Sequence, residues 1–518
     1  MKVQRDGREF TVEVTADGEG LVSHAGSALL SQVADKSGLT RALSRGLAGM
    51  RERVGGHDPG RVVRDLAVML ADGGEALCDL GAVREQAPLF GRVASDSTAY
   101  RVIERIAQDG ELLDVLRGAH ARARRHAWAL GVAPERLTID LDATLVASHS
   151  DKQGAAGNFK GGFGFHPMLA YFDESDEAAA GKLRSGNAGA NTAADQIEVA
   201  ETALEQIPLD QVAETELLLR VDSAGASHEL LDWAHDGNIR FSVGFDLTEA
   251  VRGAILALPE SAWSAALCQD GTERENGQVA EITELLDLSA WPEGSRVIVR
   301  RERPHPGAQL SFTDHDGHRF QATLTDQPGC DAAALERRHR ARARVEDQIR
   351  DDKDTGLGKL PFRQFEMNAV WLELVLLAHD LIAWTKALLL SGELARSEPK
   401  RLRHRLLHVA ASPSPAAARS CACRQAGPGH KSSPPPSRGS KHCRRRPAEP
   451  SHHLSATSTA RPRTAPREAC PERPAASSKD PPGRARRPHA PRDRPHTVKL
   501  SSPTAPPLTS RRLLHDRG

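Results

Sequence analysis

Apolar residues recur three and four positions apart over much of residues 25–130, which is the spacing of one face of an α-helix. The clearest stretches are GRVVRDLAVMLADGGEALCDL and DSTAYRVIERIAQDGELLDVLRGAHARARRHAWAL. We therefore expect residues 1–130 to form a mostly helical domain. The second stretch ends in a basic group, which is either a solvated helix end or part of a DNA-contacting helical domain. The group consists of Arg122, Arg124, Arg125 and His126.

From Arg136 the apolar spacing changes to the alternation of a β-strand. In LTIDLDATLV (137–146), aliphatic residues occupy one face, and the other face carries Thr138, Asp140, Asp142 and Thr144. Further strands and helices then alternate, which predicts an α/β domain with a mixed sheet, beginning with residues 131–245. The expected strands are 164–174, 178–183, 217–223 and 239–245, and the expected helices are 192–207 and 229–237.

Residues 246–330 interrupt this alternation and are predicted to form a β-rich insertion. SRVIVRRE (295–302) and AQLSFTDHDGHRFQATLTD (308–326) alternate like strands, with Asp316-Gly317 as a hairpin turn. The insertion also carries three arginines, which either contact DNA or guard a solvated strand edge. They are Arg300, Arg301 and Arg303.

Helical sequence returns over residues 331–410. The longest apolar run, AVWLELVLLAHDLIAW (369–384), contains Glu373, His379 and Asp380, which a bilayer would tolerate poorly. We therefore expect this run to be a buried helix and the protein not to associate with a membrane.

Charge divides the chain into two unlike parts. The whole chain has 69 Lys+Arg and 69 Asp+Glu, but residues 411–518 hold 22 of the basic and 6 of the acidic residues, a net charge of +16. Residues 1–410 therefore carry 47 basic and 63 acidic residues, a net charge of −16. The tail has 20 of the 32 prolines and no apolar periodicity, so we expect residues 411–518 to be disordered. The tail is either a nonspecific nucleic-acid-binding segment or, as we prefer, the product of a frameshift.

The cysteines and the start of the chain favour a reducing, cytoplasmic location. Only Cys78, Cys268 and Cys330 lie before the tail, which does not suggest a disulfide framework. The first residues, MKVQRDGREFTVEV, lack the apolar core of a signal peptide.

Carboxylates mark the polar face of the first strand and the end of a central strand. Asp140 and Asp142 share a face, and the pattern does not choose between them. A structural role in mid-strand would require a buried partner, so we expect one of the two to be functional. Asp222 follows the apolar strand LLLRV, at the sheet edge where open α/β folds place their chemistry. Asp222 is also suited to cap the turn DSAG.

A third segment, ARARVEDQIRDDK (341–353), places Arg342, Glu346 and Lys353 on one stripe of a helix. Alone, this pattern is typical of an exposed helix with ion pairs. Together with the two aspartate segments, it predicts a metal-dependent phosphoryl-transfer site. In such sites carboxylates hold two Mg²⁺ ions, and neighbouring cations bind DNA phosphates.

In this order the segments resemble the DDE transposases of bacterial insertion sequences, whose catalytic domain is ribonuclease H-like. The resemblance covers roughly residues 10–410 and includes IDLDATLV, KGGFGFHPMLAY, LLLRVDSAG, RHRARARVEDQIRDDK and PFRQFEMNAVWLELVLLAHDL. The family signature Tyr-x2-Arg-x3-Glu-x6-Lys reads His339-x2-Arg342-x3-Glu346-x6-Lys353 in this chain. Histidine thus replaces the tyrosine.

The resemblance implies a catalytic and metal-binding triad of Asp142, Asp222 and Glu346, which would bind two Mg²⁺ ions or Mn²⁺ in their place. It selects Asp142 over Asp140, because the first aspartate of the family precedes a small residue and a hydroxyl residue. Asp140 becomes a neighbour of the site.

The resemblance also implies DNA contacts by His339, Arg342 and Lys353. The glycine-rich stretch GNFKGGFG (157–164) lacks the Gly-x4-Gly-Lys-Ser/Thr form of a nucleotide-binding loop. We interpret it as a turn beside the active site, with Lys160 available to DNA.

The implied function is cleavage of double-stranded DNA at terminal inverted repeats and transesterification into target DNA, by a homodimer in the bacterial cytoplasm at the nucleoid. The helical region up to residue 130 would bind the element ends. Residues 131–245 and 331–410 would build the ribonuclease H-like domain around the insertion. One alternative is an inactive, degenerate copy that only binds inverted-repeat DNA. Another is a stand-alone nuclease of the same fold.

The frameshift interpretation can be tested in the gene. Translation in another frame from near codon 411 should give helical apolar periodicity in place of the Pro- and Arg-rich tail. If neither alternative frame does so, the interpretation is wrong.

Overall fold

The computed structural model describes residues 22–411 and an N-terminal hairpin, except for short gaps at 52, 54, 150, 190–191, 209–214, 305–306, 309–313 and 330. The hairpin pairs β1 (Lys2–Arg5) with β2 (Arg8–Thr11). The described residues belong to one compact unit, Met1–His430. The predicted disorder of the tail beyond Ala411 lies outside the described residues.

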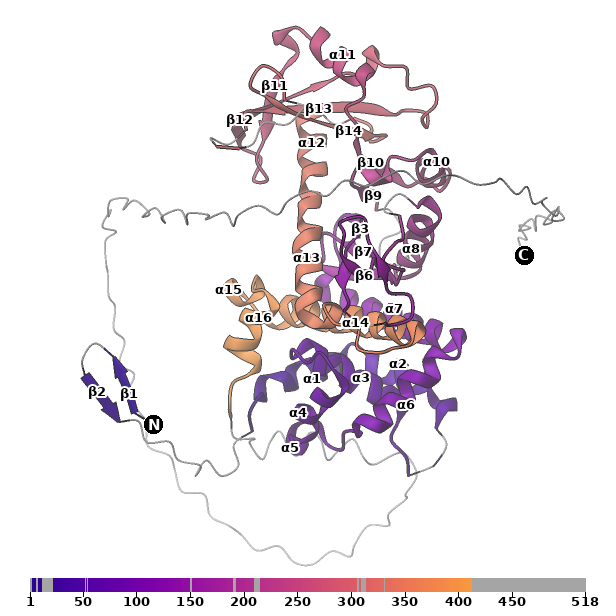
Figure 1. Cartoon of the computed structure of the whole chain (residues 1–518), viewed down its shortest axis with the longest axis vertical. Coiled ribbons are helices and arrows are strands. Elements are labelled where there is room, and N and C mark those ends of the chain that lie inside the picture. Colours follow the sequence, from indigo (N-terminus) through magenta and orange to yellow (C-terminus); the bar gives the residue numbers. More distant parts are fainter. Residues whose placement is uncertain are drawn as a thin grey trace, which may run out of the picture. The chain divides into compact units, whose positions relative to one another are not determined.

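Helices fill most of the chain from residue 25 to residue 127, in agreement with the three-and-four apolar spacing (Figure 1). The most buried of them is α3, which starts at the N-cap Asp58 and has Pro59 at its first position. The Asp58 side chain accepts hydrogen bonds from the amides of Gly60 and Arg61, which stabilises the helix start. The helices are α1 (Ala28–Lys36), α2 (Leu39–Gly46), α3 (Pro59–Ala71), α4 (Leu80–Arg84), α5 (Ala87–Phe90), α6 (Asp96–Ala107) and α7 (Gly110–Ala127).

A nine-stranded sheet forms the centre of the described fold and confirms the predicted mixed α/β class. β8-β7-β3 are antiparallel, β3-β9-β10 are parallel, and the strands from β10 through β14, β13 and β12 to β11 are antiparallel. The spatial order is β11 (Ser264–Leu267), β12 (Glu273–Glu281), β13 (Arg296–Glu302), β14 (Arg319–Thr325), β10 (Arg240–Phe245), β9 (Leu217–Val221), β3 (Leu137–Ala143), β7 (Met168–Phe172) and β8 (Glu177–Lys182).

The residues predicted as an insertion extend this sheet and do not build a sheet of their own, because β14 pairs directly with β10. The predicted turn is present: Asp316 and Gly317 have φ of 47° and 73°, the two positive values of a tight hairpin turn. β13 lies between β12 and β14 and is therefore not a sheet edge.

Two of the arginines of β13 are engaged within the fold. Arg300 is buried, and its Nε lies 3.0 Å from Glu336. Arg301 pairs with Glu260 at 2.5 Å and lies over the Trp263 ring, 4.3 Å from its centroid. Both predicted alternatives, DNA contact and edge protection, are therefore wrong for these two residues, whereas Arg303 is exposed.

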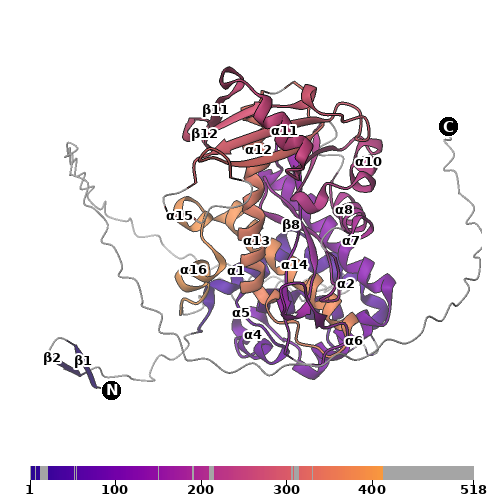
Figure 2. The same ribbon diagram turned by 45° about the horizontal axis from the view of Figure 1, so that its top comes forward.

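The two faces of the sheet carry different helices (Figures 1 and 2). Leu137, Ile139 and Leu141 of β3 share an apolar cluster with α8, α10 and α11. Asp140 and Asp142 alternate with them and point to the face on which α13 contacts β3. The helices that follow α7 are α8 (Ala193–Glu205), α10 (His228–Asp236), α11 (Glu249–Ala257), α12 (Ala332–Arg340), α13 (Arg344–Asp352), α14 (Phe365–Leu389), α15 (Gly392–Ala395) and α16 (Pro399–Leu402).

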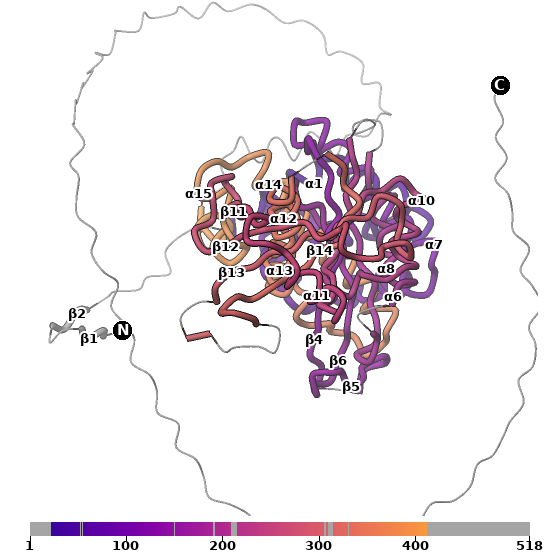
Figure 3. Tube along the Cα trace, turned by 90° about the horizontal axis from the view of Figure 1, so that it is seen from above, coloured from indigo at the N-terminus to yellow at the C-terminus, as the bar shows by residue number. Residues whose placement is uncertain are grey.

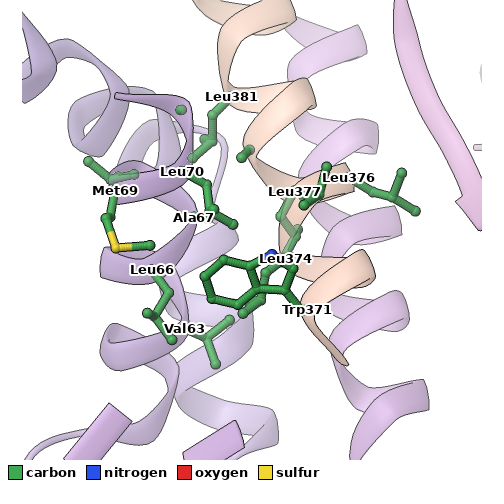
Figure 4. Packing of buried hydrophobic residues seen from close by; sticks show 14 of the residues in the cluster. Val63, Leu66, Ala67, Met69, Leu70, Trp371, Leu374, Leu376, Leu377 and Leu381 are labelled. Carbon is green, nitrogen blue, oxygen red and sulfur yellow. The ribbon is translucent and has the colours of Figure 1, made fainter. Parts of the chain in front are cut away.

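The predicted buried helix is α14, which lies between the N-terminal helices and the sheet (Figure 1). Trp371, Leu374 and Leu377 pack against α3, with Leu66 and Leu70 opposite them (Figure 4). Its other side packs against β8. Among the described residues, no helix combines the length and the apolar character that a membrane span requires.

The two ends of the range 22–411 are paired. Val22 and Ala411 form an antiparallel bridge, with N–H···O distances of 3.0 and 3.1 Å. The amide of Ala25 also donates to the carbonyl of Val409 at 2.9 Å. The start of this range is therefore hydrogen-bonded to its end.

The predicted basic end of α7 is not a uniform surface, because Arg124 is fully buried. Its Nη2 donates to Asp380 of α14 at 2.6 Å and to the carbonyl of Ala178 in β8 at 2.7 Å. Its Nε lies 3.2 Å from Glu177. Arg124 thus joins α7, α14 and the sheet, and it is unavailable to DNA. The neighbouring Arg122 is exposed.

Replacement of Arg124 by Met should lower the free energy of unfolding by about 3–5 kcal/mol, because the buried Asp380 and Glu177 would lose their main cation. Urea denaturation followed by circular dichroism measures the change. The matched control is Arg122→Met on the exposed face of α7, which should shift stability by less than about 0.5 kcal/mol. Equal effects of the two substitutions would contradict a structural role for Arg124.

Candidate functional site

Asp142 and Asp222 lie at the same level of two adjacent parallel strands. The register of β3 and β9 pairs Asp140 with Arg220, so the residues two positions further on, Asp142 and Asp222, are neighbours where the strands end. Asp142 Oδ1 accepts a hydrogen bond from the amide of Ala143 at 2.9 Å. The structure therefore brings together two carboxylates that the sequence separates by 80 positions.

Asp222 combines the two roles that its sequence context predicts. Its Oδ1 accepts a hydrogen bond from the amide of Ala224 at 3.0 Å and so caps a short 3₁₀ turn, Ser223–Gly225. Its Oδ2 lies 3.5 Å from Arg342. Because 49% of the Asp222 side chain is exposed, the capping bond leaves the carboxylate accessible.

Arg342 lies between the two aspartates, with Nη2 3.8 Å from Asp142 Oδ1 and 3.5 Å from Asp222 Oδ2. The helix predicted over residues 341–353 is present. Arg342 belongs to a 3₁₀ turn (Ala341–Ala343) that runs directly into α13, and Lys353 keeps helical dihedral angles before the chain leaves the helix at Thr355 and Gly356. The buried Nε of Arg342 has no hydrogen-bond partner among the described residues. The long contacts with the two aspartates and the unpaired Nε leave this guanidinium able to bind a further acceptor.

Glu346 is exposed in the first turn of α13, and its charge acts on Asp142. Burial raises the pKa of Asp142, the Arg342 charge lowers it, and the charges of Asp222 and Glu346 raise it again. The net pKa lies above the usual value of an aspartate. Burial is the largest cause, and the like charges of Asp222 and Glu346 add to it, so a hard divalent cation beside Asp142 would stabilise its charged form.

Lys353 and Lys160 lie beside this group. Lys353 Nζ donates to Thr144 Oγ1 at 2.7 Å, just beyond β3. Burial lowers the pKa of Lys353, the Asp142 charge raises it, and the Lys160 charge lowers it, with a net decrease. Lys160 is exposed, in the turn between β5 (Ala156–Gly157) and β6 (Phe163–Phe165). Its charge acts on the Lys353 ammonium.

His339, the substituted position of the predicted signature, packs against the sheet. Its Nδ1 is hydrogen-bonded to Ser242 Oγ of β10 at 3.0 Å. Burial lowers the pKa of His339 to about 3, and the charges of Arg220 and Arg342 act in the same direction. The imidazole is therefore neutral near pH 7 and brings no positive charge to a DNA phosphate.

Asp140 has the buried partner that a structural role requires. Arg220 Nε and Nη2 donate to its two carboxylate oxygens at 2.7 and 2.6 Å. The same guanidinium lies 2.9 Å from Asp173, and its Nη1 donates to the carbonyl of Arg338 in α12 at 2.6 Å. Burial would lower the pKa of Arg220, but the two aspartates outweigh it and raise the pKa. The only sequence signal for this pair is one arginine inside the apolar strand LLLRV.

The end of α13 is fixed by a buried carboxylate that the sequence interpretation missed. Asp352 accepts hydrogen bonds from the hydroxyl of Tyr171 and from His379 Nδ1, both at 2.6 Å. Burial opposes the charged form of His379, but the Asp352 charge outweighs it and raises the pKa of His379 to about 10. This ion pair joins α13 to α14 and positions the neighbouring Lys353.

A second group of metal-ligand type lies at the end of α3, where His24, Asp72 and His408 place three ligand atoms within 4.8 Å of one another. It is the only such group in the described part of the chain, and it involves none of the predicted site residues. The two imidazoles stack with centroids 4.0 Å apart, and His24 Nδ1 lies 2.5 Å from Asp72. His408 Nε2 lies 3.2 Å from the same carboxylate, so both imidazoles present a nitrogen to Asp72.

The fold and the site define a mixed α/β protein with converging carboxylates and flanking cations. A family model described as transposase DDE domain group 1 matches residues 4–419 of this chain, so the chain belongs to that family. Members of DDE transposase families generally use divalent metal ions.

Among solved structures, the chain is similar to a piggyBac transposase in a cryo-EM structure of its synaptic complex with hairpin DNA. The identity is 8%, the match covers 80% of this chain and 84% of that chain, and the TM-score is 0.36. No match was found among curated proteins.

The His379–Asp352 pair predicts a pH-dependent contribution to stability. Because the folded pKa of His379 lies above its unfolded value, the stabilisation is complete below pH ~6.5 and is lost as the pH rises towards about 10. The stability difference between the wild type and His379→Asn should therefore shrink over this range, as thermal unfolding at several pH values would measure. Replacement of the exposed His149 by Asn is the control. A difference that stays constant up to pH 10 would refute the assignment.

Proposed function

We propose that this protein is an Mg²⁺-dependent transposase of a bacterial insertion sequence. It would cleave DNA at terminal inverted repeats and join the freed 3′-hydroxyls to target DNA. The observation that carries the proposal is the convergence of Asp142 and Asp222 on Arg342, with the Glu346 charge acting on Asp142, in a chain of this transposase family.

The strand arrangement supports a ribonuclease H-like catalytic domain. In β8-β7-β3-β9-β10, three strands are antiparallel and the last two continue parallel to β3. We assign residues 131–245 and 331–410 to this domain and residues 246–330 to an insertion that extends its sheet. The helical region up to residue 130 would bind the inverted repeats.

Asp142, Asp222 and Glu346 would hold the ions, because carboxylate oxygens are the ligands that Mg²⁺ and Mn²⁺ prefer. The three carboxylates do not all lie within 4.8 Å of one another among the described residues, so Glu346 would have to move towards the two aspartates to share an ion. When bound, a pair of ions activates the attacking oxygen and stabilises the leaving oxygen. The protein itself would then have to grip and orient the DNA backbone.

Arg342 and Lys353 are suited to this gripping role. The contacts of Arg342 with the two aspartates are longer than hydrogen bonds, and its Nε is free of partners among the described residues, so it can turn towards a phosphate. Lys353 and the exposed Lys160 extend the positive potential along the same side. His339 would act through its bond to Ser242, by positioning α12, and not as a charged DNA contact.

We further propose that a homodimer synapses the two ends in the bacterial cytoplasm, at the nucleoid. A catalytically inactive copy that only binds inverted-repeat DNA is the second candidate. The substitution of tyrosine by His339 and the composition break near residue 411 favour it.

Glu346→Gln removes one carboxylate charge from an exposed position and should leave folding and DNA binding intact. Strand transfer should fall at least a hundredfold, since metal-ion stabilisation is worth about several kcal/mol. The assay follows the joining of labelled end fragments to a plasmid in the presence of Mg²⁺, with fragments taken from the flanks of the gene.

The matched control is Asp347→Asn, one position further along α13, where the exposed carboxylate pairs with Arg350 at 2.7 Å. This variant should retain near-normal strand transfer. Unchanged joining by Glu346→Gln would reject the triad. Binding of the ends without any cleavage by the wild type would support the inactive copy, and cutting that ignores the ends would support a nuclease.

A further inference from the structure

The end of α3 carries a buried carboxylate that two histidines approach from opposite ends of the range 22–411. Asp72 is the C-cap of α3, and its side chain is 7% exposed. His24 Nδ1 lies 2.5 Å from Asp72 Oδ2, and His408 Nε2 lies 3.2 Å from Asp72 Oδ1. Two imidazole nitrogens and one carboxylate oxygen, all within 4.8 Å of one another, form a ligand set that recurs in zinc sites.

The Asp72 carboxylate is held in one orientation by a further polar residue. Ser27 Oγ donates a hydrogen bond to Asp72 Oδ1, and Ser27 is itself buried. The backbone amide of Asp72 donates to the carbonyl of Val68 at 2.9 Å, so the carboxylate projects from an ordered helix end. Hydrogen bonds of this outer kind fix the direction of a ligating carboxylate in metal sites.

The backbone at His24 is strained in a way that serves this arrangement. His24 has a φ of 53°, in the left-handed region that residues other than glycine rarely adopt. Such strain persists only where the surroundings determine the conformation, and it is concentrated at functional sites. The surroundings here are close, because a Cβ at the neighbouring Gly26 would lie 2.0 Å from the carbonyl oxygen of Leu406.

The two imidazoles leave one side of the group open to solvent. The side chains of His24 and His408 are 30% and 35% exposed, whereas Asp72 lies behind them. Figure 3 shows α15, which leads through α16 to His408, at a margin of the described fold. An ion can therefore reach the group from the surface, and water can complete a tetrahedral coordination.

The donor atoms select the class of ion. Mg²⁺ takes oxygen ligands, so two imidazoles suit it poorly, whereas imidazole nitrogen is a good ligand for Zn²⁺. The group also shares no residue with the candidate active site. It is therefore distinct from the ions proposed at Asp142 and Asp222.

We propose that His24 Nδ1, His408 Nε2 and one oxygen of Asp72 bind a Zn²⁺ ion that ties the segment before α1 to the segment after α16. The neutral imidazoles bind through the tautomers that leave a lone pair on these two nitrogens. His24 Nδ1 and the Asp72 oxygen must separate from 2.5 Å to about 3.4 Å, the spacing of neighbouring ligands around tetrahedral Zn²⁺. The proposal does not depend on transposase activity.

Isothermal titration calorimetry of the full chain with Zn²⁺ tests the site, in excess Mg²⁺ to occupy sites that consist of oxygen ligands alone. The variants are His24→Asn and His408→Gln, whose amide nitrogens replace Nδ1 and Nε2 as donors to Asp72 but not as imidazole ligands. Each variant should lose one equivalent of Zn²⁺ or bind it about tenfold or more weakly. Zn²⁺ bound by the cysteines of residues 411–518 is common to all variants and cancels in the comparison.

Thermal unfolding gives a second measurement. Zn²⁺ should raise the unfolding midpoint of the wild type, because an ion that binds only the folded chain stabilises it. The rise should be absent in His24→Asn and His408→Gln, although both should unfold near the wild-type midpoint without Zn²⁺. The control His404→Gln removes an exposed imidazole one turn before His408 and should respond to Zn²⁺ as the wild type does.

Three results would overturn the proposal. The first is a wild-type midpoint that does not respond to Zn²⁺, which requires no variant to fold. The second is the same Zn²⁺ stoichiometry and affinity in all four proteins. The third is a rise of the midpoint that survives both His24→Asn and His408→Gln, which would assign the stabilising ion to another place in the chain.

Discussion

The buried ion pair between Arg124 and Asp380 is the constraint on which the arrangement depends. It fixes α14 against both α7 and the sheet, so the N-terminal helices and the strands are held in a defined position relative to each other. The adjacent residue of α14, His379, then holds Asp352 and with it the end of α13. Arg342 lies just before α13, and Glu346 lies within it. The positions of both residues therefore depend on a charge pair in a different part of the fold. Buried charges without partners are too costly to persist, which makes the chain of contacts obligatory.

Sequence periodicity was sufficient to predict the elements that pack through an apolar face. The alternation in LTIDLDATLV correctly separated Leu137, Ile139 and Leu141 from the aspartates, and the apolar run 369–384 correctly indicated a buried helix. Periodicity does not show which residues from distant parts of the sequence come into contact. Asp140 and Asp142 have the same pattern, and only the position of Arg220 on the next strand shows which carboxylate is neutralised in the core. The sequence pattern likewise groups the buried Arg124 with surface arginines, because it does not show the carboxylates that pair with this residue.

Asp142, Asp222 and Arg342, which the sequence groups into one candidate site, lie near one another in the fold, but their geometry could not be predicted from spacing. A helical stripe aligns Arg342 with Lys353, but the chain has 3₁₀ geometry before α13 and leaves the helix at Thr355 and Gly356, just beyond Lys353. Spacing rules assume a uniform helix, and they fail where the end of a helix is held by tertiary contacts such as Asp352 with Tyr171. His339 shows a related limit, because its neutral state results from burial beside Arg220 and Arg342, which the motif does not encode.

The bridge between Val22 and Ala411 has a consequence for the order in which the chain is made. Val22 leaves the ribosome early, but its partner follows only after almost the whole described fold has been synthesised, about 20–80 s later at ordinary rates of translation. The segment that leads into α1 must remain without this contact during that time. Completion of the N-terminal helical region therefore comes late in synthesis, and a chain that stops short of residue 411 cannot form the bridge.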